Sequence, residues 1–369
     1  MKILFIDPYE KTLFNFREEL VDTLISEGYQ IILCIDKTDK VKKLFEDRVY
    51  KIIDVKLNLK DKNILSNLKL KKKYKTIIKE EKPDLIITYT IKSNLYCAFN
   101  TKRVPMIANI TGLGNMFKSK NLLSVLGIFL YRMSFKNVDY VFFQNEDELQ
   151  FFKKNKITIN NYKVIPGSGV NTTKFFYDPS IRNNTINFLF ASRGIKEKGF
   201  NLLIKAIPLV IKENRNVHFN FLVAEEDITK DKELNKIINE YSDYISVIDR
   251  SYDMASFYHA NDFLVSPSYY REGISNVLLE SLSCGRPIIT TKDNPGCKEV
   301  LQDNVNGFGV ISKDLPSLVD ALIKASYLSK DTIDKMGLDG REFVIKNFER
   351  QIVIDSYLDV INIIKSKKS

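Results

Sequence analysis

Short apolar runs alternate with longer segments of helical spacing along the first part of the chain. The runs are Lys2–Asp7, Gln30–Ile35, Leu85–Tyr89, Met106–Ile110 and Tyr140–Phe143. Continuous apolar runs bounded by turn residues indicate strands that are buried on both faces. Segments such as Asn15–Glu27 and Leu65–Glu81 carry helical spacing between them. We therefore expect a parallel sheet that is covered by helices.

The alternation pauses and then starts again in the second part of the chain. The pause begins at Ile165–Val170, a run that contains proline and glycine, and mostly polar residues follow to Thr185. New strand-like runs then occur at Ile186–Ala191, Phe219–Val223, Ile245–Ile248, Phe263–Ser266 and Pro287–Thr290, and Asp331–Lys365 is predicted to be helical. The pattern predicts an α/β protein of two doubly wound, Rossmann-like domains, with the ligand cleft between them at the carboxyl ends of the strands.

Composition limits the partners of the chain without choosing one. Lysine and arginine number 56 against 46 acidic residues, and the net charge of +10 favours anionic partners such as nucleotides or acidic lipid headgroups. No recognised nucleic-acid-binding motif is present, so we expect no nucleic acid. The cysteines form no C-x-x-C pair and the only histidines are His218 and His259, which gives no basis for a metal site. Cys34 lies in an apolar run and is expected in the core, which fits a reducing cytoplasm.

Two further features leave a membrane contact open. The apolar stretch Leu122–Phe135 is too short to span a bilayer, which needs about 20 residues. Its basic neighbours suit a helix lying in the membrane surface, and the alternative is a buried core helix. The lysine cluster within Lys69–Lys75 fits either an anionic leaflet or a solvated helix face. The apolar run at the N-terminus is too short for a signal peptide.

The most informative segment is Pro267–Glu280, in which a strand-like run ends in a polar loop and a helix is predicted to start near Ser275. The free backbone N–H groups of such a start attract phosphate, and here they belong to Gly273, Ile274, Ser275 and Asn276. Along a helix, Glu272 and Glu280 would be about 12 Å apart, which is too far for a glycosidase pair. They could instead hold opposite ends of one elongated ligand. The alternative is an ordinary helix start with two surface glutamates.

A second strand-to-helix loop, Phe190–Gly199, carries Arg193 and Lys198. Both side chains can reach the carboxyl edge of the sheet, where a planar guanidinium and an ammonium suit a diphosphate leaving group. The alternative is that both are ordinary solvated basic residues.

Together these segments resemble the signature blocks of family 4 retaining glycosyltransferases. The blocks are Glu272-x7-Glu280, the Arg193…Lys198-Gly199 pair, Ile165–Val170 and Gly285–Thr291. The resemblance covers nearly the whole chain and implies the GT-B architecture, in which two Rossmann-like domains face each other across a cleft. It implies an acceptor-binding domain at 1–165, a nucleotide-sugar-binding domain at 166–348 and a helix at 349–369 that crosses back to the first domain.

The N-terminal half resembles the subgroup that extends undecaprenyl-diphosphate-linked glycans. That subgroup serves capsule, O-antigen and protein N-glycosylation pathways and includes N-acetylgalactosaminyltransferases. The similarity rests on Phe14–Arg17, Lys92–Tyr96 and Thr111–Gly114. It implies an acceptor site formed by Arg17, Lys92, Asn94, Thr111 and Gly112.

The resemblance implies a peripheral enzyme at the inner face of the plasma membrane that moves a hexose or N-acetylhexosamine from a UDP-sugar to a lipid-linked saccharide. Arg193 and Lys198 would stabilise the charge on the leaving diphosphate, which is commonly the largest catalytic effect. Glu272 would be a catalytic residue that binds the donor sugar, with a role as nucleophile as the alternative, and Glu280 would bind the ribose hydroxyls. No D-x-D motif is present, and the basic pair can replace a cation, so we expect no metal and no other cofactor.

The chain departs from the family pattern at several positions. Asn171 stands where the family often has aspartate, and Asp249 stands near the expected base site where glycine is frequent. The N-terminal half lacks the histidine that many relatives have near the sugar, and the resemblance places Thr111 or Lys92 near that position. We expect both histidines of the chain to be structural. The alternative functions are a UDP-sugar epimerase of similar architecture and an inactive, membrane-bound sugar-binding scaffold.

Overall fold

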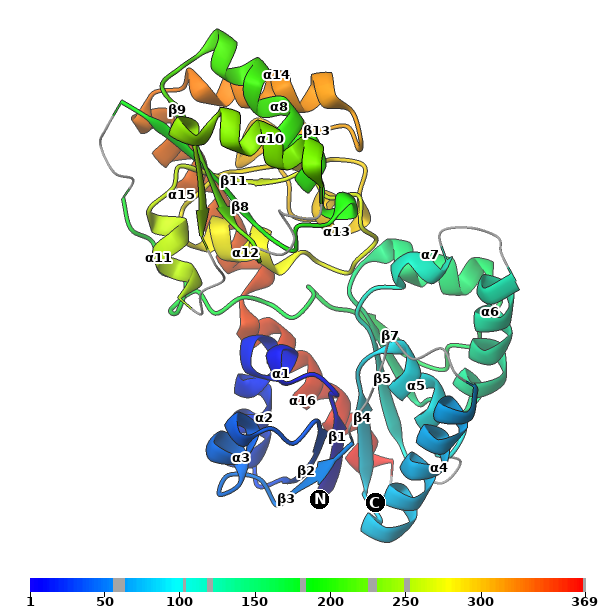
Figure 1. Ribbon diagram of the computed structural model, residues 1–369. Coiled ribbons are helices and arrows are strands. Elements are labelled where there is room, and N and C mark those ends of the chain that lie inside the picture. The colour runs from blue at the N-terminus through cyan, green and yellow to red at the C-terminus, as the bar shows by residue number, and fades with distance from the viewer. Residues whose placement is uncertain are drawn as a thin grey trace. The chain divides into compact units, whose positions relative to one another are not determined.

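The chain folds into two compact units, each built on a parallel sheet (Figure 1). The computed structural model describes residues 1–55, 64–101, 104–117, 122–179, 184–224, 231–248 and 253–367. Unit 1 comprises Met1–Ser168 and Val353–Ser369, and unit 2 comprises Gly169–Ile352. The chain thus enters unit 2 just after the predicted boundary at 165/166, and its last residues belong to unit 1. Asp249, which departs from the family pattern, lies outside the described residues.

Parallel strands in the order β3-β2-β1-β4-β5-β6-β7 form the sheet of unit 1. The strands are β1 (Lys2–Ile6), β2 (Gln30–Ile35), β3 (Lys51–Asp54), β4 (Leu85–Thr88), β5 (Met106–Ile110), β6 (Tyr140–Phe143) and β7 (Tyr162–Val164). The chain first winds outward from β1 to β3 and then crosses to β4 on the other side of β1. This order is typical of a Rossmann-like sheet and makes the β1/β4 edge its topological switch point.

Helices cover both faces of this sheet. One face packs against α1 (Glu10–Phe16), α2 (Glu18–Ser26), α3 (Asp39–Phe45) and the C-terminal α16 (Arg350–Ser366). The other face packs against α4 (Ile64–Glu81), α5 (Ile91–Ala98), α6 (Leu122–Ser134) and α7 (Glu146–Lys154). Within β1, Ile3 and Phe5 belong to the first core cluster and Leu4 and Ile6 to the second. Burial on both faces explains why the strands are apolar at successive positions.

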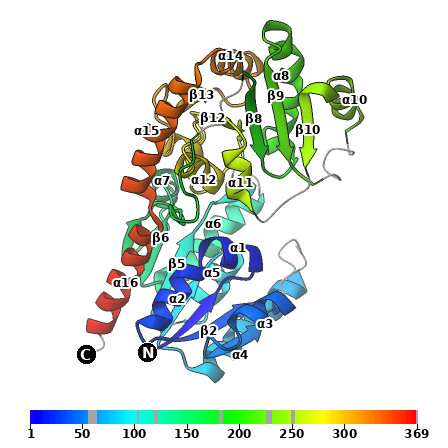
Figure 2. The same ribbon diagram turned by 90° about the vertical axis from the view of Figure 1, so that its left-hand side faces the viewer.

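The sheet of unit 2 repeats this winding in the order β10-β9-β8-β11-β12-β13 (Figure 2). Its strands are β8 (Ile186–Ala191), β9 (Val217–Leu222), β10 (Ile245–Ile248), β11 (Phe263–Ser266), β12 (Ile288–Thr291) and β13 (Gly307–Val310). One face carries α8 (Phe200–Glu213), α10 (Lys232–Glu240) and α14 (Leu315–Ser326), and the other carries α11 (Met254–His259), α12 (Asn276–Ser283) and α13 (Pro295–Lys298). Helix α15 (Lys330–Phe348) contributes to both clusters. The prediction of two doubly wound α/β units is confirmed.

The structure corrects several predicted elements. The helix expected at Asn15–Glu27 is two helices, because Arg17 leaves the helical conformation (φ −136°, ψ −6°) and turns its guanidinium toward Asp7. The helix expected at Asp331–Lys365 breaks at Glu349, where the backbones of Val170 and Arg350 are hydrogen-bonded at 3.0 Å. Strands β3, β7 and β13 were not predicted. All three are short and lie at sheet edges, where fewer positions need to be apolar.

Helix α15 approaches the end of α12 most closely at Gly337. A Cβ at this position would lie 1.9 Å from the carbonyl oxygen of Gly285. Alanine usually favours a helix over glycine by about 1 kcal/mol, but here we expect Gly337→Ala to destabilise the protein by about 1–3 kcal/mol through overpacking. The exposed neighbour provides the control, because Leu338→Ala should leave the melting temperature nearly unchanged. A higher melting temperature for Gly337→Ala would contradict this packing.

Candidate functional site

The loops that follow β8 and β11 meet at the topological switch point of the unit 2 sheet. Strand β8 leads into the short helix η3 (Lys196–Lys198) and α8, and β11 leads through a loop into α12. Gly199 permits the close approach, because its φ is +83° and a Cβ there would lie 2.4 Å from the carbonyl oxygen of Pro267. Open α/β sheets bind their ligands at such a point.

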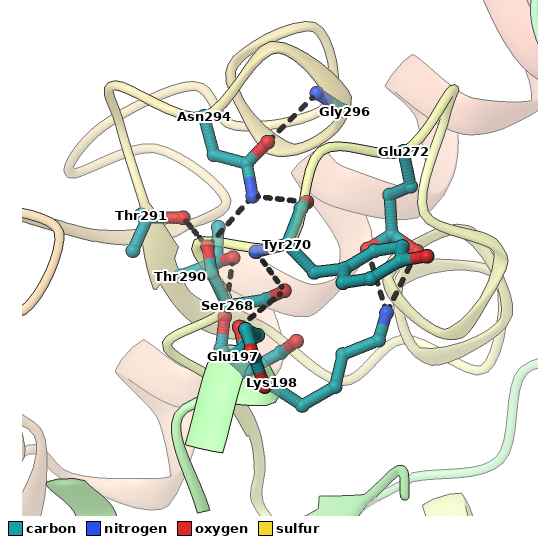
Figure 3. A network of polar contacts seen from close by, with 10 residues as sticks. Glu197, Lys198, Ser268, Tyr270, Glu272, Thr290, Thr291, Asn294 and Gly296 are labelled. Carbon is teal, nitrogen blue, oxygen red and sulfur yellow. Dashed lines mark hydrogen bonds and ion pairs between the residues drawn. The ribbon is translucent and has the colours of Figure 1, made fainter. Parts of the chain in front are cut away.

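An ion pair between Lys198 and Glu272 joins the two loops (Figure 3). The Lys198 Nζ atom lies 2.8 Å from Oε1 and 2.7 Å from Oε2 of Glu272. The two side chains are 12% and 22% exposed, so the pair is partly shielded from water but open to a ligand. The ring centroid of Tyr270 lies 5.4 Å from Lys198 Nζ and 5.4 Å from the guanidinium carbon of the exposed Arg193. Both basic groups predicted to bind a diphosphate therefore lie beside one aromatic ring.

Polar residues at the end of β12 and just after it fix the loop that carries Tyr270 and Glu272 (Figure 3). The Asn294 side chain donates hydrogen bonds to the carbonyl groups of Ser268 at 2.7 Å and Tyr270 at 3.1 Å. The Thr291 hydroxyl donates to the same Ser268 carbonyl at 2.5 Å. Sequence reasoning missed Tyr270 and Asn294 as parts of the site. The polar end of an otherwise apolar strand β12 is the signal that could have located this anchor.

The start of α12 agrees with the prediction in position but not in its hydrogen bonds. Ser275 is the N-cap residue, with no capping bond from its side chain. Its backbone N–H donates to the carbonyl of Gly296 at 3.1 Å, so this amide is not free for a phosphate. Gly273 and Ile274 are buried in the preceding loop, and Asn276 is partly exposed in the first turn. Glu272 also precedes the helix, so the separation from Glu280 expected from helical rise does not apply.

Glu280 lies within α12 and accepts a hydrogen bond from the Tyr258 hydroxyl at 2.8 Å. Burial raises the pKa of Glu280 to about 7, although the bond from Tyr258 and the positive charges of Lys174 and Arg350 act in the opposite direction. Arg286 in turn supports Tyr258. It is 1% exposed and donates to the Tyr258 carbonyl at 3.2 Å, at the end of α11. A carboxylate held in this way can accept hydrogen bonds from neighbouring hydroxyl groups of a ligand.

Both histidines have contacts within unit 2. His218 Nε2 lies 2.8 Å from the Ser246 hydroxyl, and burial lowers its pKa. His259 Nε2 lies 2.9 Å from the carbonyl oxygen of Phe176. Among the described residues, no group of three or more histidine, cysteine, aspartate or glutamate side chains is placed to hold a metal ion.

The structure does not bring all of the residues predicted to bind an acceptor together in unit 1. Asn94, Thr111 and Gly112 line a small cavity at the ends of β4 and β5, whereas Arg17 and Lys92 do not. Lys92 is partly exposed on α5. Arg17 is 6% exposed, with its Nε atom 3.2 Å from the Asp7 carboxylate and its guanidinium carbon 3.9 Å from the centroid of the Tyr89 ring. These contacts give Arg17 a structural role inside unit 1.

A buried hydrogen-bond network holds the wall of the cavity. Asn94 accepts from the Thr88 hydroxyl at 2.6 Å and donates to the carbonyl of Asn109 at 2.8 Å. The Asn109 side chain accepts from the Tyr357 hydroxyl at 2.5 Å, and Tyr89 lies 2.7 Å from the same hydroxyl. Since Tyr357 lies on α16, the C-terminal helix helps to position the amides at the carboxyl edge of the first sheet. Sequence reasoning missed this contribution.

Comparison with known proteins gives the class of the chain. Residues 185–326 match the family described as "Glycosyl transferases group 1", and residues 2–145 match "Glycosyl transferase 4-like". The chain is 24% identical over 350 residues, 90% of each chain, to N,N'-diacetylbacillosaminyl-diphospho-undecaprenol alpha-1,3-N-acetylgalactosaminyltransferase of Campylobacter jejuni.

Solved structures share the fold over nearly the whole chain. Sucrose-phosphate synthase of Thermosynechococcus elongatus superposes with a TM-score of 0.82 at 16% identity and covers 100% of both chains. HepE of Anabaena, solved with UDP and glucose, gives a TM-score of 0.77 at 15% identity and covers 98% and 99% of the two chains. The protein therefore has the GT-B fold. It is a glycosyltransferase.

The raised pKa of Glu280 predicts a pH-dependent stability. An unfolded glutamate releases its proton near pH 4.5, whereas the folded carboxyl retains its proton to about pH 7. Stability contributed by this group is therefore lost as pH rises from about 4.5 to 7 and is constant above that range. We expect Glu280→Gln to become more stable relative to wild type across this window, by up to about 3 kcal/mol.

Thermal unfolding at several pH values measures this difference. Glu213→Gln, which removes an exposed carboxylate from α8, is the control and should show a flat difference. A flat difference for Glu280→Gln as well would contradict the raised pKa.

Proposed function

We propose that this glycosyltransferase moves a hexose or N-acetylhexosamine from a UDP-sugar to an undecaprenyl-diphosphate-linked saccharide, with retention of configuration, in bacterial surface glycan assembly. The observation that carries the proposal is the Lys198–Glu272 ion pair beside Arg193 at the switch point of unit 2. The name of the Campylobacter relative supports a diphospho-undecaprenol acceptor, and the HepE complex supports UDP as the donor nucleotide. The proposal that the configuration of the sugar is retained rests on the resemblance to family 4 retaining glycosyltransferases.

The donor's diphosphate competes with Glu272 for Lys198. Both oxygens of Glu272 accept from the ammonium group of Lys198, so each charge neutralises the other. A diphosphate that pairs with Lys198 and Arg193 releases the Glu272 carboxylate, which can then accept hydrogen bonds from hydroxyls of the donor sugar. The same two cations stabilise the charge that develops on the leaving UDP.

Other groups complete the donor site. The backbone N–H groups of Gly273, Ile274 and Asn276 lie at or beside the start of α12, where a helix N-terminus favours phosphate. Glu280, in its ionised form, accepts the ribose hydroxyls. The built-in positive charge takes the place of a metal ion, so no cofactor is needed.

Unit 1 meets the acceptor. Asn94, Thr111 and Gly112 share one cavity at the carboxyl ends of β4 and β5, the edge where such sheets bind ligands. Lys92 lies on α5, which begins at this edge, and supplies positive charge for an anionic acceptor. Arg17, which is buried against Asp7 and Tyr89, supports the edge from within.

Helix α6 supports a peripheral contact with a membrane. Its small and polar residues Ser124, Gly127 and Ser134 face the core, whereas Leu122, Leu126 and Phe129 are 86%, 50% and 55% exposed. Helix α4, with exposed lysines between Lys69 and Lys75, packs on the same face of the sheet. An apolar surface near basic residues suits the headgroup region of an anionic leaflet. In the described part of the chain, no helix is long and apolar enough to cross a bilayer. We propose attachment at the inner face of the plasma membrane.

The phosphate clamp predicts large losses of transfer in single variants. We expect Lys198→Ala or Arg193→Ala to lower kcat for sugar transfer at least about 100-fold, because each removes a charged contact to the leaving group. Lys196→Ala, an exposed lysine of the same short helix η3, is the matched control and should remain near wild type. Turnover near wild type in both clamp variants would remove the proposed donor site.

Metal removal should leave the reaction intact. Because the cations that stabilise the leaving group belong to the protein, we expect transfer to continue in excess EDTA at an unchanged rate. Loss of activity in EDTA that Mg²⁺ or Mn²⁺ restores would show that the diphosphate needs a metal ion.

Liposome binding tests the surface of α6. The protein should pellet with anionic liposomes at low salt and be partly released at high salt, because screening weakens the electrostatic attraction. The combined change of Leu122, Leu126 and Phe129 to Ser should weaken pelleting and leave UDP-sugar binding intact. Leu130 is retained because it packs against the core.

The control for this test replaces Val305, Leu338 and Ile345 of unit 2 by Ser, since these are also exposed apolar residues. This control should pellet like wild type. If the α6 variant also pellets normally, another surface meets the membrane, and equal pelleting with neutral liposomes would exclude the electrostatic contribution.

A further inference from the structure

A buried hydroxyl at the cavity of unit 1 has no role in the mechanism above. Tyr131, on α6, is 0% exposed and lines the cavity together with Asn94, Thr111 and Gly112. Its hydroxyl has no hydrogen-bond partner among the residues that the structure describes. A buried hydroxyl without a partner is unfavourable, so such a group calls for a ligand or a bound water.

Aromatic packing holds the Tyr131 ring in place. Its centroid lies 4.8 Å from that of Phe135, 5.1 Å from that of Phe152 and 6.1 Å from that of Phe117. Turning the ring to reach a partner elsewhere would break these contacts. The ring is therefore held in one orientation, with Tyr131 lining the cavity.

The size of the cavity limits what can enter. The space open to the centre of a water molecule is about 10 Å³, close to the lower limit for one water-sized group. The side-chain amides of Asn94 on α5 and Asn109 on β5 are hydrogen-bonded to Thr88 and Tyr357, so the walls cannot rearrange easily. This space is too small for a whole sugar ring and is comparable to a single hydroxyl group.

A strained residue lines the same cavity. Thr90 has φ +74° and ψ 150°, a conformation that is largely restricted to glycine. Strain of this kind persists where the surroundings impose it and is concentrated at ligand sites. Thr90 is the N-cap of α5, and its carbonyl accepts a hydrogen bond from the backbone N–H of Asn94 at 2.9 Å.

We propose that the cavity receives one hydroxyl group of the acceptor's terminal sugar and that Tyr131 hydrogen-bonds to it, which makes Tyr131 a specificity-determining residue for the acceptor. The inference rests on the proposed function, because it needs a saccharide acceptor. A sugar hydroxyl can both donate and accept, as can the phenol. A site built to bind a substrate hydroxyl strongly rejects an analogue that lacks it, because the polar group of the site is then left unpaired.

The test pairs Tyr131→Phe with deoxygenated acceptors. We would measure kcat/KM with synthetic lipid-diphosphate-linked saccharides and with analogues in which each hydroxyl of the terminal sugar is replaced in turn by hydrogen. The kcat/KM of the wild type should be at least about 10-fold lower for one particular analogue than for the parent acceptor. For Tyr131→Phe, kcat/KM for the parent acceptor should fall by a similar factor, so that the variant no longer distinguishes the parent acceptor from that analogue. Its KM for the UDP-sugar should be unchanged. Tyr140→Phe, a tyrosine of β6 that does not line the cavity, is the control and should behave as wild type.

Several outcomes would overturn the inference, and they are distinguishable from failure of the proposed function. Wild type that tolerates every deoxygenation, or Tyr131→Phe with wild-type kcat/KM, overturns the role of Tyr131 while transfer itself stands. A variant with a lower melting temperature but unchanged acceptor kinetics shows that the hydroxyl binds a structural water, and this also overturns it. A wild-type enzyme that transfers sugar to none of the lipid-diphosphate-linked saccharides overturns the proposed function and the inference together.

Discussion

The electrostatic pairing of Lys198 with Glu272 is the interaction on which the candidate donor site depends. The two residues are 74 positions apart in the sequence and meet because the sheet of unit 2 reverses its winding between β8 and β11. A partly buried ion pair adds little stability once the cost of desolvating both charges is counted. In the proposed function, its value is that a diphosphate can pair with the cation and so release the carboxylate. The hydrogen bonds from Asn294 and Thr291 to the Ser268 carbonyl hold the loop that carries Glu272.

The sheets of the two units share the same winding, but the ion pairs at their switch points differ in exposure. At the switch point of unit 1, Arg17 pairs with Asp7 in a site where the side chains are only 7% and 1% exposed, and the Tyr89 ring covers the guanidinium. Burial raises the pKa of Asp7, while the charge of Arg17 lowers it. That pair is closed and structural. The cavity of unit 1 lies instead at the ends of β4 and β5, where it is lined by residues that include Asn94, Thr111 and Tyr131.

Much of this organisation could be predicted from the sequence, because buried parallel strands are apolar at every position and the loops after them carry the chemistry. Strands β5, β6, β8, β10 and β11 have the bounds predicted from the apolar runs. Lys198 and Glu272 were predicted to lie at one site from their places after two such strands, and the structure brings them into contact. The edge strands were not predicted because they are short and less apolar. The break at Arg17 was not predicted because a buried ion pair overrides helical spacing.

The remaining features depend on tertiary contacts that no local pattern reveals. The apolar run Leu122–Phe135 does not show which of its faces is buried; in the structure Ser124, Gly127 and Tyr131 face the core, whereas Leu122, Leu126 and Phe129 are exposed. The amide of Ser275 was expected to be free, but the distant carbonyl of Gly296 takes it. Tyr357 contributes to the edge of the first sheet from the far end of the sequence. Each of these contacts joins residues that are remote along the chain, so residue type and spacing do not encode them.

The proposed transfer of a sugar from UDP to a lipid-diphosphate-linked saccharide can be tested by analysis of its product. The purified protein would be incubated with single UDP-sugars (UDP-Gal, UDP-GalNAc, UDP-Glc and UDP-GlcNAc) and a lipid-diphosphate-linked saccharide, and the product examined by mass spectrometry and NMR. We expect an acceptor extended by one hexose or N-acetylhexosamine in the same α configuration as in the donor, with release of UDP. An inverted linkage would contradict retention, and conversion of the donor to its epimer without an extended acceptor would contradict the transfer itself.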